Sequence, residues 1–151
     1  MSGVAYTGKP PRMNYEVSLE AMRRSGGDFF IGLTLPVGTN ACTVIIGGWG
    51  GGVCGISSID YIDASESPYS EGLALKNEKW YKLCVRVTER CFEVQLDGDL
   101  YAVKIPFKDT RCFSLRPGYD IENTLPLGLS TYETHALWRN IRIRSLKQER
   151  K

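Results

Sequence analysis

The sequence predicts an all-β domain, and three observations carry this prediction. Apolar and polar residues alternate with a period of two along most of the chain, and turn residues separate these segments at short intervals. Apolar residues nowhere recur at three-to-four spacing over a dozen positions, which excludes long amphipathic helices. Many short strands in 151 residues favour one domain, built as an antiparallel sandwich or a barrel.

The first expected strand shows the alternation most clearly. Tyr15, Val17, Leu19 and Ala21 fall on one face, and the residues between them are mostly polar. Further strands are expected at Phe29–Leu35, Cys42–Gly47, Val53–Ser57, Trp80–Thr88, Cys91–Asp97, Leu100–Ile105, Leu125–Thr131 and Leu137–Leu146. The predicted core comprises Val17, Leu19, Ile31, Leu33, Val44, Ile46, Leu83, Val85, Val94, Leu96, Leu129, Ile141 and Ile143.

Domain boundaries follow from where this alternation starts and stops. We expect an N-terminal extension at 1–13, a single domain at 14–146 and a basic tail at 147–151. The 19 basic and 17 acidic side chains give a net charge of +2, and the basic strand Arg139–Arg144 is interpreted as a solvated face. Nucleic acid is therefore not an expected partner, because a protein that binds nucleic acid concentrates its basic residues on one surface.

Membrane insertion is not expected either, since no run approaches the roughly 18 apolar residues of a membrane span. The first residues lack a signal-peptide core, so the chain is expected to be soluble as given. It would be exported or periplasmic if it is a mature fragment of a longer protein.

The cysteines predict thiols and not a metal site. They are odd in number, form no CxxC pair and fall inside apolar strand patterns, which indicates buried free thiols. His135 is the only histidine, so no transition-metal site is expected. The five cysteines are Cys42, Cys54, Cys84, Cys91 and Cys112.

A glycine cluster with a single tryptophan, Gly47–Gly52, joins two strand-like runs and is the most informative local feature. Glycine permits positive φ and close approach by another molecule, so Trp49 could form a flat platform for a sugar ring or a protein side chain. The alternative is an ordinary bulged hairpin in which Trp49 folds back to fill the end of the core.

A polar segment after the next strand supplies oxygen-bearing side chains near this loop in sequence. Asp60, Asp63, Ser65 and Glu66 are candidates for hydrogen bonds to sugar hydroxyls. Calcium is an alternative ligand for so many oxygens, although the spacing matches no EF-hand, and a plain surface loop is the third interpretation. Arg116 could bind a carboxylate or stack on a ring, or simply stabilise its turn.

Four features stand in order along the chain: the Trp80–Val103 meander, its Asp97-Gly98 turn, Leu127-Gly128-Leu129 and the closing Trp138–Ile143 strand. In this combination the chain resembles the concanavalin A-like lectin/glucanase superfamily, and within it the bacterial 3-keto-disaccharide hydrolase-like family. The resemblance covers residues 14–146. It implies a jelly-roll sandwich of two antiparallel sheets that binds carbohydrate or processes glycosides.

Catalysis is expected to be absent or weak. Many members of that family carry an acidic strand facing the sugar, whereas the corresponding stretch here, Cys42–Gly48, holds no acid. Glycoside cleavage usually needs two carboxyl groups roughly 5 to 10 Å apart, but Glu16 and Glu20 are about 13 Å apart by strand rise. Glu20 is the candidate acid if activity exists. The alternative function is a non-catalytic protein-interaction module of a larger exported protein.

Overall fold

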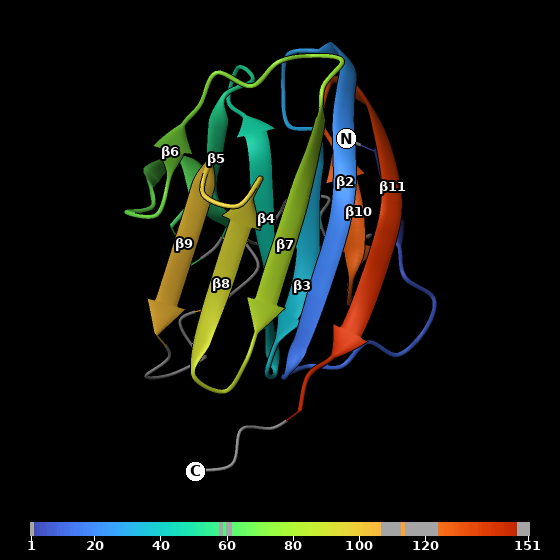
Figure 1. Ribbon diagram of the computed structural model, residues 1–151, viewed down its shortest axis with the longest axis vertical. Helices are drawn as coiled ribbons and strands as arrows, with labels where there is room; N and C mark the ends of the chain where they lie inside the picture. The colour runs from blue at the N-terminus through green and yellow to red at the C-terminus, as the bar shows by residue number, and fades with distance from the viewer. Residues whose placement is uncertain (1, 58, 60–61, 107–112, 114–123, 148–151) are drawn as a thin grey trace.

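The protein is an antiparallel β-sandwich, seen in a computed structural model that describes residues 2–57, 59, 62–106, 113 and 124–147 (Figure 1). Two sheets of six and five strands pack face to face, which decides between the sandwich and the barrel. The strands are β1 (Ser2–Ala5), β2 (Tyr15–Gly26), β3 (Ile31–Val37), β4 (Asn40–Gly48), β5 (Val53–Ser57), β6 (Glu71–Gly72), β7 (Trp80–Val87), β8 (Cys91–Leu96), β9 (Tyr101–Pro106), β10 (Gly128–Thr131) and β11 (Thr134–Ser145). A short 3₁₀ turn, η1, spans Ala64–Glu66.

Each of the two sheets has its own order of strands. Sheet A runs β1-β10-β3-β4-β5-β6, and sheet B runs β11-β2-β7-β8-β9. The meander predicted from Trp80 to Val103 is confirmed as β7-β8-β9, joined by short turns as the sequence indicates. Strand β1 lies inside the expected extension 1–13 and pairs with β10, so this part of the chain contributes to sheet A.

The core lies between the sheets and follows the period-two pattern. On β2, buried residues alternate with half-buried ones from Tyr15 to Arg23. Every predicted core residue is buried except the two on β11, Ile141 and Ile143. The alternation therefore identified the inward faces of the central strands correctly.

Ile141 was predicted to be in the core, and this prediction is wrong, because its side chain is 52% exposed. Two residues of β11, Asn140 and Ile141, lie opposite the single residue Leu19 of β2, and Asn140 has a φ of 54°. This bulge interrupts the simple alternation of an end strand. Ile143 lies beyond the bulge and is only half-buried, at the margin of the core.

Strands β3 and β4 are buried on both faces, which alternation alone does not predict. Their inward face is apolar, whereas the outward face carries a hydroxyl pair, Thr34 and Thr43, whose Oγ1 atoms are 2.9 Å apart. Thr124 donates to Thr34 at 2.8 Å. Thr124 therefore contacts this face and helps satisfy its buried hydroxyls.

The outward face of sheet B carries ion pairs between neighbouring strands. Arg86 on β7 donates to Glu16 on β2 through Nε and Nη2, at 3.1 and 2.7 Å. Arg144 on β11 contacts the other Glu16 oxygen at 3.3 Å. The hydrogen bonds from Arg86 are the main reason that the pKa of Glu16 is lowered from its usual value.

Replacing Glu16 is expected to cost stability in a pH-dependent way. Because the pKa of Glu16 is lower in the folded than in the unfolded chain, its carboxylate stabilises the fold fully above the unfolded-state pKa. This contribution disappears as the pH falls through the folded-state pKa. Glu16→Gln should therefore be less stable than wild type at pH 7, with a difference that shrinks below about pH 4.

Urea unfolding midpoints between pH 7 and pH 3 measure this difference. Glu66→Gln is the matched control, because Glu66 is exposed on η1, and it should track wild type across the range. A Glu16→Gln deficit that stays constant with pH would contradict the electrostatic origin.

Candidate functional site

The β4–β5 hairpin presents Trp49 to solvent. Its turn contains Gly47, Gly50 and Gly51 with φ values of 85°, 91° and 111°, and Trp49 itself has a φ of 47°. The Gly51 N–H donates to the Gly48 carbonyl at 3.2 Å, which closes the turn. The Trp49 side chain is 48% exposed, so it does not fill the end of the core and is available as a platform.

A buried arginine, Arg23, fixes the backbone of this hairpin. Arg23 is only 4% exposed, and its guanidinium lies 5.3 Å from the centroid of the Phe30 ring. It donates at 2.6–3.4 Å to five oxygens: Asn77 Oδ1 and the carbonyls of Asp28, Gly47, Gly51 and Leu75. Within the part of the chain that the structure describes, no carboxylate pairs with it, so backbone carbonyls and one amide satisfy the charge.

Arg23 was not singled out from the sequence, although the pattern held a signal. It is the next residue in phase after Ala21 on the inward face of β2, so a charged residue stands at a position where the alternation predicts burial. What it would bond to was not visible, because its partners Gly51 and Leu75 are far along the chain.

Two further loops lie beside the hairpin at the same end of the sandwich, the upper end in Figure 1. The Asp28 N–H donates to Thr134 Oγ1 at 3.1 Å, and the Tyr132 N–H donates to the Phe29 carbonyl at 3.3 Å. The Phe29 and Tyr132 rings stack with centroids 6.2 Å apart. We call residues 27–29, 47–52 and 132–134 the Trp49 end.

The Asp28 carboxylate lies next to the hairpin. A Cβ placed on Gly48 would be 3.8 Å from both Asp28 Oδ1 and Phe29 Cβ, and Gly48 directly precedes Trp49. Asp28 Oδ1 also accepts the Phe29 N–H at 2.8 Å, which orients the carboxylate. The Trp49 end thus combines an exposed indole, a stacked aromatic pair and a carboxylate acceptor.

The predicted polar segment lies elsewhere. Asp63 accepts a hydrogen bond of 3.3 Å from Ser57, at the end of β5 farthest from the hairpin turn. Strand rise puts Ser57 about 15 Å from that turn. Ser65 is half-buried and Glu66 exposed on η1, whereas Asp60 and Arg116 lie outside the described residues. The structure therefore does not bring Asp63, Ser65 and Glu66 beside Trp49.

Glu20 lies on the outward face of β2, between Lys82 of β7 and Arg139 of β11. Asn140 and Arg139 both donate to its Oε2, the latter at 3.1 Å. These hydrogen bonds, from Asn140 first, lower the pKa of Glu20. A general acid at neutral pH needs a raised pKa, so these surroundings hold Glu20 as a carboxylate.

Among the described residues, the cross-strand neighbours of Glu20 supply no second carboxyl group. Its partners across the sheet are Lys82 and Arg139, both cationic. Glu93 of β8 aligns instead with Arg86, and through it with Glu16. The acids of β2 are thus each flanked by cations on the neighbouring strands, which neutralise Glu20.

Metal and thiol chemistry find little support in the described residues. No group of three His, Cys, Asp or Glu side chains there could hold a metal ion. Among the described residues, Cys42, Cys54, Cys84 and Cys91 form no disulfide, and burial raises the pKa of the Cys54 thiol to about 11, while Cys112 lies outside the described residues. Such a thiol stays protonated at neutral pH. None of the described residues form a helix that could span a bilayer.

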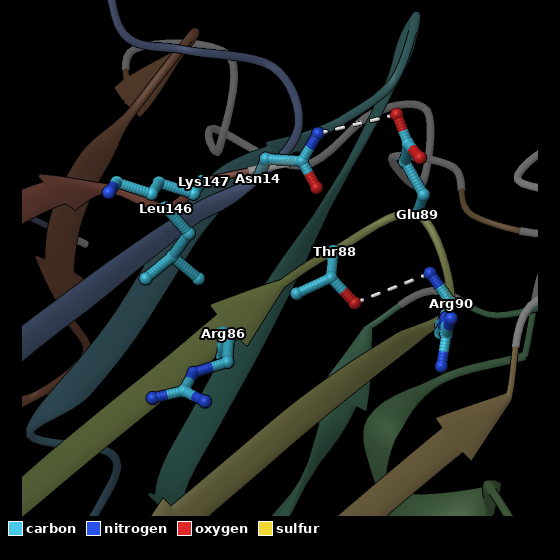
Figure 2. Close-up of a pocket in the computed structure, with 7 residues that line it drawn as sticks. All are labelled: Asn14, Arg86, Thr88, Glu89, Arg90, Leu146 and Lys147. Atoms are coloured by element: carbon cyan, nitrogen blue, oxygen red, sulfur yellow. Dashed lines mark hydrogen bonds between the residues drawn. The ribbon is translucent and has the colours of Figure 1, made fainter. Parts of the chain in front are cut away.

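A hollow of about 360 Å³ lies at the end of the sandwich opposite the Trp49 end (Figure 2). Arg86, Arg90 and Lys147 line it, but Glu89 lines it as well and accepts a hydrogen bond of 3.4 Å from Asn14. Arg86 is already bound by Glu16. Mixed and internally paired charges give this hollow no clear preference for an anionic or cationic ligand.

Comparison with protein-family models and with curated proteins gives no match to this chain. The resemblance to the 3-keto-disaccharide hydrolase-like family therefore stays a hypothesis that rests on the sequence motifs.

Arg23→Met is expected to destabilise the protein by about 2–5 kcal/mol, because it leaves several buried carbonyl groups without a donor. The amides of the 47–52 turn should exchange faster than in wild type, since the turn loses two of its anchoring bonds. Urea unfolding and hydrogen exchange measure the two effects.

Arg24→Met is the matched control, because Arg24 is the exposed neighbour of Arg23 on the same strand. It should change the free energy of unfolding by less than about 0.5 kcal/mol. Equal effects of the two substitutions would show that Arg23 does not have the anchoring role assigned to it.

Proposed function

We propose that this protein recognises carbohydrate at the Trp49 end without cleaving it. The observation that carries the proposal is an exposed indole on a glycine-rich turn whose backbone is held by a buried arginine. An aromatic ring in a fixed position can stack on the apolar face of a pyranose without first losing conformational freedom.

The surroundings of Trp49 suit a ligand rich in hydroxyl groups. The Asp28 carboxylate, which lies next to Gly48 in the same turn region, can accept hydroxyl protons. Apart from its chain neighbours, no atom of the described residues lies within 4 Å of a Cβ placed on Gly50, so a ligand can approach the backbone there. Phe29 and Tyr132 offer a second ring surface, with Tyr132 41% exposed.

The proposal includes membership of the concanavalin A-like superfamily with its jelly-roll arrangement. The antiparallel two-sheet sandwich is consistent with that resemblance, and so is the closing strand β11. Asp63, Ser65 and Glu66 enter the proposal only as contacts for an extended oligosaccharide, because they lie away from the hairpin turn. Binding is favoured over glycoside processing because Glu20 is ionised and flanked by cations.

Trp49→Ala should weaken glycan binding at least tenfold, which corresponds to about 1.4 kcal/mol of lost stacking. Trp49→Phe should retain part of the affinity, since it keeps a smaller ring. A glycan array identifies the ligand, and titration calorimetry with the best oligosaccharide measures the change.

Tyr6→Ala is the matched control, because it removes an equally exposed aromatic side chain away from the Trp49 end. Tyr6 is 47% exposed and lies beyond the end of β1. It should bind glycan like wild type. If no sugar binds, or if Trp49→Ala leaves every glycan response unchanged, the carbohydrate function is refuted.

Release of a 3-keto sugar from a 3-keto-glucoside is expected to be undetectable above the rate without protein. Glu20 cannot donate a proton efficiently while its pKa is depressed by Asn140 and Arg139. A colorimetric or chromatographic assay with wild type, Glu20→Gln and Asp63→Asn checks this. Robust turnover that Glu20→Gln abolishes would overturn it and make Glu20 catalytic.

A further inference from the structure

The sandwich is open along one lateral edge, between the end strands of the two sheets. There β1 of sheet A faces β11 of sheet B, and an apolar cavity of about 180 Å³ lies between them. Val17 and Leu33 belong to its floor, and Val4, Tyr6, Ile141 and Ile143 line its sides. Val4 is 59% exposed and Ile141 52%, so apolar side chains of both sheets face solvent at one place.

Strand β11 is also an unpaired edge. Among the strands that the structure describes, it pairs with β2 on one side only and forms one end of sheet B (Figure 1). Alternate residues of an end strand direct their N–H and C=O groups away from the sheet, where an added strand can bond to them. After the bulge, the register with β2 is regular from Arg142 to Ser145.

The charges on β11 indicate what such a strand would carry. Arg142 has no ion-pair partner among the residues described here, and its side chain is exposed. Arg144 is 64% exposed and makes one contact of 3.3 Å to Glu16, an acid that also binds Arg86 more closely. Both arginines therefore retain donors for additional carboxylates.

These charges disfavour two registers in which β11 would pair with a second copy of itself. Antiparallel self-pairing centred on Ile143 would place Arg142 opposite Arg144, and centring on Arg142 would place two copies of that residue opposite each other. Like charges directly opposite on a sheet are destabilising. An acidic strand in the same position gains attraction at the same two residues.

We propose that the β11 edge binds an extended peptide segment whose acidic and apolar residues alternate, and that this segment adds to sheet B as an antiparallel strand. Residues opposite each other in a ladder share a face. Acids opposite Arg142 and Arg144 would thus lie on the outward face, and apolar residues beside Ile143 would enter the open cavity. The mode is β-strand addition, with affinity from the backbone and specificity from the alternating side chains.

The probes are three fluorescein-labelled octapeptides: alternating (Glu-Val)₄, the block peptide Glu₄Val₄ of the same composition, and alternating (Lys-Val)₄. Fluorescence anisotropy with the full chain at low salt should show saturable binding of (Glu-Val)₄. The other two should bind at least tenfold more weakly, and added salt should weaken (Glu-Val)₄. Equal binding of the block peptide would overturn strand addition.

Protein variants locate the binding on the edge. Arg142→Glu and Ile141→Asp, both at exposed positions, should each weaken (Glu-Val)₄ binding at least tenfold. Lys104→Glu is the matched control, since it reverses a charge on β9, the end strand on the other side of sheet B, and it should change binding less than twofold. Circular dichroism verifies that each variant is folded, and Arg142→Gln provides a milder substitution with a smaller loss in the same direction.

Two outcomes refute the proposal. Binding of (Glu-Val)₄ that survives Arg142→Glu and Ile141→Asp would place the peptide elsewhere. A dimer in analytical ultracentrifugation that Ile141→Asp dissociates would assign the edge to a second copy. Trp49→Ala should leave peptide binding unchanged, so failure of the glycan site and failure of the edge site are distinguishable.

Discussion

Arg23 places a positive charge inside the sandwich with no carboxylate partner among the described residues, and the geometry of the Trp49 end depends on how that charge is satisfied. Removing a guanidinium from water is costly unless its donors are all used. Here the donors meet Asn77 and carbonyl groups from three separate segments of the chain. The same bonds that satisfy the charge therefore hold the 26–28 loop, the β4–β5 turn and the 75–77 segment in one arrangement.

This clamp explains how the backbone of a glycine-rich turn that carries an exposed tryptophan keeps a defined conformation. Glycines give the turn its positive φ values but leave the unfolded chain with more conformational freedom. Arg23 limits this freedom in the folded protein, because it donates hydrogen bonds to the Gly47 and Gly51 carbonyls. Its side chain is buried, so it leaves the outer surface of the turn uncovered. Rigidity and access are thus provided by different residues, which is the condition for a preorganised binding platform.

The electrostatic surroundings of the carboxylates on sheet B make them unsuited to acid catalysis. Glu16 and Glu20 each receive hydrogen bonds from cationic or amide donors on neighbouring strands, so both pKa values are lowered. The same face ends at β11, where Arg142 and Arg144 extend the row of cations to the margin of the sheet. The cations that pair with Glu16 and Glu20 in the middle of the sheet thus continue to its edge, where the proposed peptide partner is acidic.

The sequence by itself determined the fold class, the strand order along the chain and most of the core. These depend on the period-two alternation and on local turn chemistry, which are properties of neighbouring residues. It also located the turn that carries Trp49. The resemblance to a carbohydrate-active family rests on the sequence alone as well, and the sandwich is consistent with it.

Tertiary structure alone decided which distant groups meet. The partners of Arg23 come from loops up to 54 residues away, and no local pattern encodes such pairings. Ile141 lies at the open margin of the sandwich, and the bulge at Asn140 places it opposite Leu19, a register that only the pairing with β2 reveals. Satisfying the buried hydroxyls of Thr34 and Thr43 required Thr124, from elsewhere in the chain. Alternation specifies which face of a strand is apolar, whereas contacts between strands and loops specify what covers that face and what remains open.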